Sequence, residues 1–255
     1  MFLAVDAGNT NIVLGLYEGE TLRKTWRMKS DVHRSTDETR LFLRQLLQEK
    51  DVNVDCITAA MVASVIPRLS GTLQDALEEL TGIRPMLLTH ELELGIQNLY
   101  NHPENVGPDR LANAVGGIAR YGAPLAVVDF GTATTFDVIT RNKEYLGGVI
   151  LPGLEMSADS LFQKTSMLPR IAIARPDRVI GRSTLEAITS GIVLGSAAMV
   201  DALMLRIREE LSEPDCTLIA TGGHAPTLAA YSHEIKLVDN DLTLFGMLKA
   251  WEQNT

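Results

Sequence analysis

The fold is decided by Val5-Asp6-Ala7-Gly8-Asn9-Thr10-Asn11, a turn near the start of the chain. Residues 2–6 predict a buried strand, and residues 12–17 predict the strand that returns after the turn. Gly8 lets backbone N–H groups approach an anion, and the amide and hydroxyl side chains that follow add donors. An aspartate at the strand end suits a hydrated Mg²⁺ or a reacting hydroxyl beside a phosphate. A hairpin turn capped by an Asx side chain explains the same residues equally well.

A second copy of this pattern begins the second half of the chain. Val128-Asp129-Phe130-Gly131 repeats the order of Val5-Asp6-Ala7-Gly8, and residues 134–139 predict another returning strand. The match is imperfect, because Thr10 falls opposite Ala133 and Asn9 falls opposite Thr132. Two copies at equivalent points predict an internal duplication, with one nucleotide site shared by the two turns.

The segments between the two copies predict alternating strands and helices. After a three-strand meander, Ser35 and Glu38 form a capping box that opens a helix. A strand, a second helix and a short strand follow, which is the order of an α/β layered fold. In the second half, Ser183 and Glu186 predict another capping box, opening a long helix to about residue 210. Residues 242–251 predict an apolar final helix.

Composition narrows the class of protein. The 255-residue chain has a formal net charge of −9, which argues against a nucleic-acid partner. One basic run predicts a solvated hairpin and loop, with a lid over phosphates as the lesser alternative: Arg23, Lys24, Arg27, Lys29 and Arg34. Two distant cysteines, Cys56 and Cys216, fit a reducing compartment. With no leader at the amino terminus, we expect a cytoplasmic protein without a membrane segment.

Two further motifs carry chemistry. Thr221-Gly222-Gly223-His224-Ala225 predicts a turn after a strand, where paired glycines let a ring or ribose lie on the backbone. Gly107-Pro108-Asp109-Arg110 predicts a helix start, with proline first and an aspartate favoured by the helix dipole. The same four residues equally suit a site in which Asp109 accepts a hydroxyl proton and Arg110 holds an anionic group. These two interpretations of the motif are compatible.

Taken together, four motifs resemble the type III pantothenate kinases of the acetate and sugar kinase/Hsp70/actin superfamily. They occur in order along nearly the whole chain: Asp6-Ala7-Gly8-Asn9-Thr10-Asn11, Gly107-Pro108-Asp109-Arg110, Asp129-Phe130-Gly131-Thr132-Ala133-Thr134-Thr135 and Gly147-Gly148-Val149-Ile150-Leu151-Pro152-Gly153. The resemblance implies two ribonuclease H-like domains of duplicated βββαβαβ type, at 1–115 and 116–255, with ATP bound in the cleft between them. It also implies a cytoplasmic homodimer that phosphorylates the 4′-hydroxyl of pantothenate, the first step of coenzyme A biosynthesis.

The same resemblance implies roles for individual residues. Asp109 would be the general base. ATP phosphates would contact Asp6, Ala7, Gly8, Asn9, Thr10, Asn11, Ile12, Val13 and Thr132. Pantothenate would contact Tyr100, Gly107, Pro108, Asp109, Arg110 and Thr184, although a capping-turn role explains Thr184 equally well. Mg²⁺ would lie near Asp6, through water, and a monovalent cation, K⁺ or NH₄⁺, would bind Asp129.

Two other functions stay open at this point. One is a kinase of the same superfamily that acts on a sugar or a carboxylate, which Gly107-Pro108-Asp109-Arg110 with Tyr100 upstream argues against. The other is a nucleotide-binding regulator without catalysis, which an intact Asp109 argues against. For the homodimer, Gly191 and Gly195 are spaced to let two helices approach closely, and a contact within the chain would use the same spacing.

Overall fold

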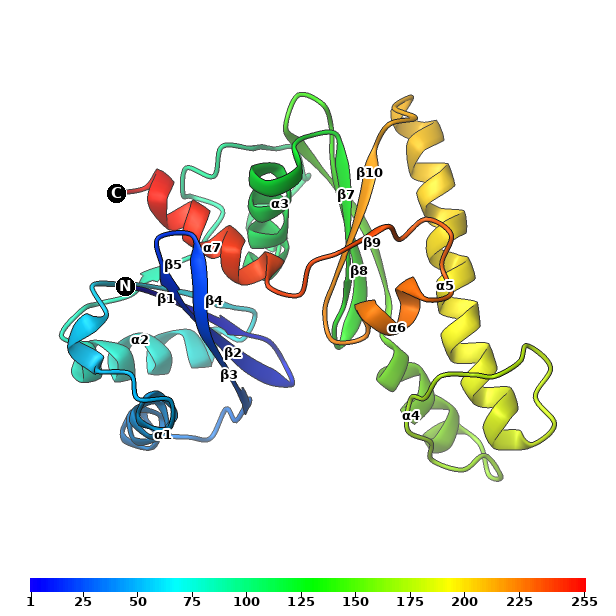
Figure 1. Ribbon diagram of the computed structural model, residues 1–255, viewed down its shortest axis with the longest axis horizontal. Helices are drawn as coiled ribbons and strands as arrows, with labels where there is room; N and C mark the ends of the chain where they lie inside the picture. Colours follow the sequence, from blue (N-terminus) through cyan, green and yellow to red (C-terminus); the bar gives the residue numbers. More distant parts are fainter. The chain divides into compact units, whose positions relative to one another are not determined.

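A computed structural model describes all residues, 1–255 (Figure 1). The chain divides into two units, one formed by Met1–Arg120 with Leu242–Thr255 and the other by Tyr121–Asp241. The chain therefore leaves the first unit after Arg120 and returns to it at Leu242.

The first unit is built on a five-stranded sheet in the order β3-β2-β1-β4-β5. Its strands are β1 (Phe2–Ala7), β2 (Asn11–Glu18), β3 (Thr21–Lys29), β4 (Ala59–Ser64) and β5 (Met86–Leu87). The meander β1-β2-β3 is antiparallel, whereas β4 pairs parallel with β1, and β5 pairs parallel with β4. Apolar residues fill β1 and β4, which predicts their burial on both faces.

Helices cover this sheet on both sides. The helices and helical turns of this part are α1 (Thr36–Glu49), η1 (Val54–Cys56), α2 (Pro67–Thr81), η2 (Pro103–Asn105), α3 (Pro108–Tyr121) and α7 (Leu242–Gln253), and a short strand, β6, spans Gln97–Asn98. The predicted capping box of α1 is confirmed: Ser35 accepts from the Glu38 N–H, and the Glu38 carboxylate accepts from the Ser35 N–H. Leu43 of α1 and Leu73 of α2 are fully buried against the sheet, while α7 packs against β1 and β4.

The second unit repeats the strand order of the first. Its strands are β7 (Leu125–Phe130), β8 (Ala133–Ile139), β9 (Glu144–Pro152), β10 (Thr217–Thr221) and β11 (Leu237–Val238). They run in the order β9-β8-β7-β10-β11, with an antiparallel meander followed by two parallel pairings. Each strand has its counterpart in the first unit, so the duplicated α/β architecture predicted from the two turns is confirmed.

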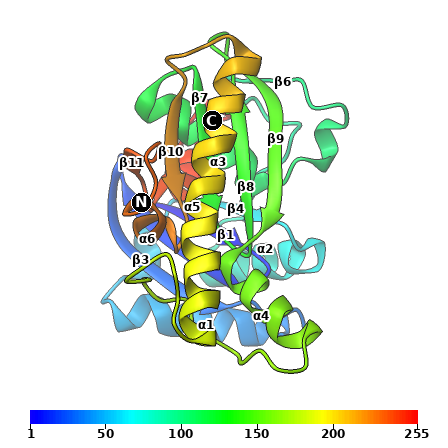
Figure 2. The same cartoon turned by 90° about the vertical axis from the view of Figure 1, so that its right-hand side faces the viewer.

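The helices of the second unit are α4 (Leu154–Lys164), α5 (Thr184–Leu211) and α6 (Ala225–Ala229). The long helix α5 lies across one face of the sheet (Figure 2), and Ile192, Val193 and Val200 pack into the core that β7, β8 and β10 supply. By length and composition alone, α5 is long and apolar enough to cross a membrane, although we expected no membrane segment from the sequence. Core helices of soluble proteins pass the same test, and 44% of its apolar window is buried.

Two details differ from the sequence-based expectations. At the start of α5, Ser183 accepts from the Glu186 N–H as predicted, but the Glu186 carboxylate accepts from the N–H of Arg182 instead of Ser183. The expected domain range 116–255 included the last helix, whereas α7 packs in the first unit. Its apolar side chains meet the sheet there: a Cβ at Gly15 of β2 would lie 2.9 Å from Leu244.

Candidate functional site

The turn after β1 is held by backbone bonds and by the end of β3. The N–H of Gly8 donates to the carbonyl of Asn11 at 3.0 Å. Ser30 adds two bonds, because its hydroxyl donates to the Gly8 carbonyl at 2.6 Å and its N–H donates to the Thr10 carbonyl at 3.0 Å. Asn9 and Thr10 remain exposed. The turn is thus a braced loop with exposed polar side chains.

Ser30 did not stand out in the sequence. It lies one residue beyond β3, among basic residues that predicted a solvated loop. A serine directly after the third strand of a meander was the only local signal, and many surface loops share it.

Asp109 lies in the first turn of α3, as the helix-start interpretation predicted. Its Oδ1 accepts a hydrogen bond from the N–H of Arg110 at 2.9 Å. Burial raises the pKa of the Asp109 carboxyl above its ordinary value, while the N–H and the charge of Arg110 act in the opposite direction. A carboxyl with a raised pKa is a stronger base once it is ionised, which is what a group that accepts a hydroxyl proton needs.

Gly107 provides the space that the Asp109 carboxylate occupies. A Cβ at Gly107 would lie 2.4 Å from Asp109 Oδ1, closer than real Cβ contacts allow. It would also lie 3.6 Å from Cγ1 of Val65. A side chain at position 107 would therefore displace the Asp109 carboxylate, because no backbone atom is among the atoms that it would crowd.

Val65 connects this segment to the turn after β1. It follows β4, and its N–H donates to the carbonyl of Ala7, at the end of β1, at 3.2 Å. Its side chain faces Gly107. Because β1 and β4 are parallel, their carboxyl ends meet at one edge of the sheet, where ligands of open α/β sheets bind. Within the first unit, the Asp6 turn and the Asp109 segment are therefore assembled at the same edge.

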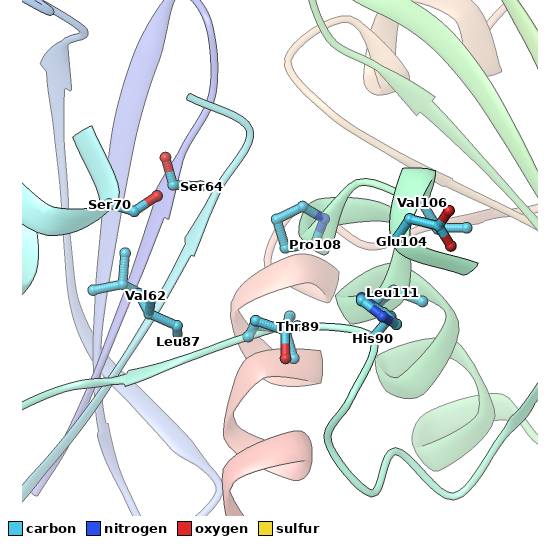
Figure 3. A pocket seen from close by; sticks show the side chains of 11 residues that line it. Val62, Ser64, Ser70, Leu87, Thr89, His90, Glu104, Val106, Pro108 and Leu111 are labelled. Carbon is cyan, nitrogen blue, oxygen red and sulfur yellow. The ribbon is translucent and has the colours of Figure 1, made fainter. Parts of the chain in front are cut away.

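A cavity of about 190 Å³ lies beside the first turn of α3 (Figure 3). Pro108 and Leu111 of α3 form one wall, and Ser64 and Ser70 lie on the other side. The remaining lining residues are Val62, Leu87, Leu88, Thr89, His90, Glu104 and Val106. The lining mixes apolar side chains with hydroxyl groups, an imidazole and a carboxylate, and every residue that lines the cavity belongs to the first unit.

The other residues predicted to contact substrate in the first unit are Tyr100 and Arg110. Tyr100 is half-buried shortly before η2, and its N–H donates to the side chain of Asn98 at 3.1 Å. Arg110 is buried, with 7% of its surface exposed. A buried guanidinium requires anionic or carbonyl partners, so its place next to Asp109 makes this segment strongly polar inside an otherwise apolar region.

In the second unit, three segments meet around the turn after β7. The N–H of Gly131 donates to the carbonyl of Ala133 at 3.1 Å, two residues on, whereas the Gly8 bond reaches three residues on. Gly222 follows β10 with φ +89°, and a Cβ there would lie 2.5 Å from Asp129 Oδ1. Gly153, at the start of α4, packs so closely on the turn that a Cβ would lie 2.7 Å from the Gly131 carbonyl. The Gly222-Gly223 motif is thus brought directly against Asp129, a contact that spacing could not predict.

Thr132 and Thr184 are both exposed. Thr132 lies in the turn after β7, at the position equivalent to Asn9. Thr184 is the first residue of α5, directly after the capping Ser183, which fits its predicted capping-turn location. The predicted residues therefore fall into two sets. Asp6 to Val13, Tyr100 and Gly107 to Arg110 belong to the first unit, and Asp129, Thr132 and Thr184 belong to the second.

The acidic side chains suit cations that are shared with a nucleotide. No group of three or more His, Cys, Asp or Glu side chains is arranged to hold a metal ion. Mg²⁺ commonly binds through one or two carboxylates, with water and substrate phosphates completing its shell. Asp6, a single carboxylate at the end of β1 next to a phosphate-type turn, fits that mode. Asp129 Oδ1 and the backbone of Phe130 both lie within 3 Å of the position that a Cβ at Gly222 would take.

Comparison with known proteins identifies the family. The family model described as type III pantothenate kinase matches residues 2–206. The type III pantothenate kinase of Finegoldia magna is 42% identical over 97% of this chain and 95% of its own length. That of Myxococcus xanthus is 42% identical over 100% of this chain and 99% of its own length. A solved Baf family structure from Campylobacter jejuni is 22% identical with a TM-score of 0.62, covering 99% and 98% of the two chains. The chain belongs to the type III pantothenate kinase family.

Proposed function

We propose that this protein transfers the γ-phosphoryl group of ATP to the 4′-hydroxyl of pantothenate, the first step of coenzyme A biosynthesis. One observation carries the proposal beyond family membership. The Gly107-Pro108-Asp109-Arg110 segment holds a partly buried carboxylate, with a raised pKa, at the sheet edge that also holds the turn after β1. Kinases of this family use ATP with a divalent metal, and a carboxylate so placed suits an alcohol acceptor.

In this proposal Asp109 orients the 4′-hydroxyl and takes its proton as the bond to phosphorus forms. Phosphoryl transfer depends mainly on alignment and on stabilisation of charge, so one well-placed base is sufficient. Gly107 keeps the carboxylate in place by leaving it room, and the Arg110 N–H fixes one of its oxygens. The other carboxylate oxygen is then the one that faces the substrate hydroxyl.

The two braced turns would hold the phosphates of ATP. Asp6 to Val13 and Thr132 supply backbone N–H groups and side-chain donors, and Gly222-Gly223 would lie against the adenosine. Bound Mg²⁺ would neutralise charge on the phosphates from the side of Asp6. Asp129 would hold a monovalent cation, K⁺ or NH₄⁺, which adds positive charge near the same phosphates.

Substrate contacts in this proposal come from several segments. Arg110 would pair with the pantothenate carboxylate or its amide oxygen, since a guanidinium forms strong bonds to such groups. Tyr100 would lie along the chain of the substrate, and Thr184 would donate a hydroxyl from the start of α5. We retain the division into two duplicated domains, with residues 1–120 and 242–255 in the first and residues 121–241 in the second.

We also propose a cytoplasmic homodimer that forms along α5. A groove between α4 and α5 is lined by small and apolar residues, among them Leu161, Gly191 and Gly195. Beside it, Met156, Phe162 and Leu185 are each more than 40% exposed. An apolar surface of this kind on a soluble enzyme is typical of a subunit interface. The net charge of −9 argues against a nucleic acid as the partner on this face.

Substrate-dependent release of ADP tests the proposed activity. The purified protein would be incubated with ATP and Mg²⁺, and with pantothenate, a panel of sugars or a panel of short carboxylates in turn. Among these acceptors, we expect only pantothenate to support ADP release from ATP, and we expect the rate of release to fall sharply when Na⁺ replaces K⁺. Release with a sugar or a carboxylate in place of pantothenate would refute the assigned substrate, and indifference to K⁺ would refute the cation at Asp129.

A further inference from the structure

Helix α3 carries Asp109 in its first turn, and α7 holds α3 in place from the side. The two helices cross at a pair of glycines. A Cβ at Gly116 would lie 2.6 Å from the carbonyl oxygen of Leu242, and a Cβ at Gly246 would overlap the carbonyl oxygen of Ala112. The two backbones are therefore in direct contact, which fixes the distance between the helices.

A hydrogen bond joins the helices next to this crossing, and farther along α3 the Arg120 guanidinium lies 3.9 Å from the centroid of the Phe245 ring of α7. The Thr243 hydroxyl, in the first turn of α7, donates to Oδ1 of Asn113 at 2.7 Å. Asn113 is fully buried, with 0% of its surface exposed. Close backbone contact limits separation of the helices but leaves rotation about the α3 axis less constrained. A buried hydrogen bond is directional and costly to break, so it can fix that rotation.

Asn113 lies four residues after Asp109, which is about one helical turn. Side chains four residues apart lie on the same face of a helix. A rotation of α3 that moves Asn113 therefore moves the Asp109 carboxylate in the same direction. The bond from the Arg110 N–H to Asp109 lies within the first turn, so it moves with the helix and cannot resist such a rotation.

We propose that Thr243 and Asn113 are positioning residues for phosphoryl transfer, because their hydrogen bond sets the rotation of α3 and thereby the direction of the Asp109 carboxylate. This inference rests on the proposed function, since it requires Asp109 to be the base. It makes turnover depend on Thr243, a residue of the last helix that lies more than 130 residues after Asp109 in the chain.

The test compares three variants with the wild-type protein. Thr243→Val removes the hydroxyl and keeps the shape of the side chain, while Thr243→Ser keeps the hydroxyl. Thr81→Val is the matched control, because the Thr81 hydroxyl donates to the Leu77 carbonyl at 2.7 Å in the same unit, at the end of α2. We expect Thr243→Val to lower kcat about tenfold with an unchanged KM for ATP, since small misplacements of a catalytic group are costly. Thr243→Ser and Thr81→Val should stay within about twofold of wild type.

Thermal unfolding of each variant separates positioning from stability. Thr243→Val and Thr81→Val should both lower Tm by a few degrees, because each loses partly buried hydrogen bonding. Thr81→Val loses at least as much, since the Thr81 hydroxyl also contacts the carbonyl and the N–H of Ile83. If both lose stability and both keep wild-type kcat, the hydrogen bond is structural only and the inference is wrong. Should Thr243→Val fail to fold, Thr243→Ala is assayed against Thr243→Ser, and equal kcat in these two would likewise overturn it.

A double variant shows whether Thr243 acts through Asp109. In an Asp109→Asn background, Thr243→Val should cause no further loss of the residual turnover, since the group it positions is already disabled. A further tenfold loss in that background would contradict the inference. If the wild-type protein itself shows no pantothenate-dependent turnover, the proposed function fails instead, and the two failures are thus distinguishable.

Discussion

The Gly107→Ala substitution probes the general base without touching its chemistry. A Cβ at position 107 would lie 2.4 Å from Asp109 Oδ1, and real Cβ contacts are essentially never below 3.0 Å. The carboxylate oxygen must therefore retreat by at least about 0.6 Å, because its own side chain is the flexible partner and α3 is fixed. Its hydrogen bond from the Arg110 N–H, 2.9 Å long, would be strained or lost.

The expected cost is in turnover. A misplacement of about 1 Å in a catalytic group can reduce the rate about 100-fold, so we expect kcat to fall roughly 10- to 100-fold. That range corresponds to about 1.4–2.7 kcal/mol of transition-state stabilisation. The free energy of unfolding should change little, because Ala in place of Gly restricts the unfolded chain by about 0.4–1 kcal/mol and offsets the local crowding.

The assay measures kcat, the KM for pantothenate and ATP, and thermal unfolding. Gly71→Ala is the matched control: Gly71 lies in α2 of the same unit, and a Cβ there meets nothing within 4 Å. The control should be stabilised by up to about 1 kcal/mol with kcat unchanged. If Gly107→Ala kept kcat within about twofold of wild type, the carboxylate position seen here would not be the one used in catalysis, and the reasoning would be refuted.

Three further outcomes are expected from the same structure. Because burial raises the pKa of Asp109 in the free protein, the acid limb of the pH dependence of kcat/KM should lie above the ordinary aspartate value of 3.8, and Asp109→Glu should shift it. The pKa of Asp109 is higher in the folded protein than in the unfolded chain, so the folded protein binds the Asp109 proton more tightly. Protonated Asp109 therefore stabilises the fold at low pH, and this contribution declines as pH rises from 3.8 to the raised pKa. If the free energy of unfolding of wild type relative to Asp109→Asn rose over that pH range, the result would contradict this expectation. Gly246→Ala should destabilise the protein by about 1–3 kcal/mol, because its Cβ overlaps the Ala112 carbonyl, and a Tm equal to that of wild type would disprove the close crossing of α3 and α7.

Local patterns in the sequence were sufficient to predict most elements. The Asp-x-Gly turns, the capping residues and the alternation of strands with helices depend on neighbours within a few positions, so they can be inferred from short stretches. The repeat of the turn at Asp6 and Asp129 was the observation that predicted two similar sheets, and the equivalent strand orders bear it out.

Long-range choices could not be predicted in this way. The apolar residues of α7 require burial, but nothing in them specifies which sheet they cover; the fit of Gly246 against α3 decides it. The same limitation applies to Ser30, which braces the first turn, and to Gly222, which lies against Asp129. Each contact joins segments at least twenty residues apart, and its partner becomes evident only once the sheets are formed.

The central claim is that Asp109 accepts the proton of the pantothenate 4′-hydroxyl during transfer from ATP. The most direct measurement quantifies 4′-phosphopantothenate formed from ATP and pantothenate by wild type and by Asp109→Asn, with ATP binding measured by calorimetry on both proteins. We predict product from wild type, a loss of at least about 100-fold in Asp109→Asn, and similar ATP affinity for the two. Equal product from both proteins, or no product from a wild-type protein that binds ATP, would contradict the account.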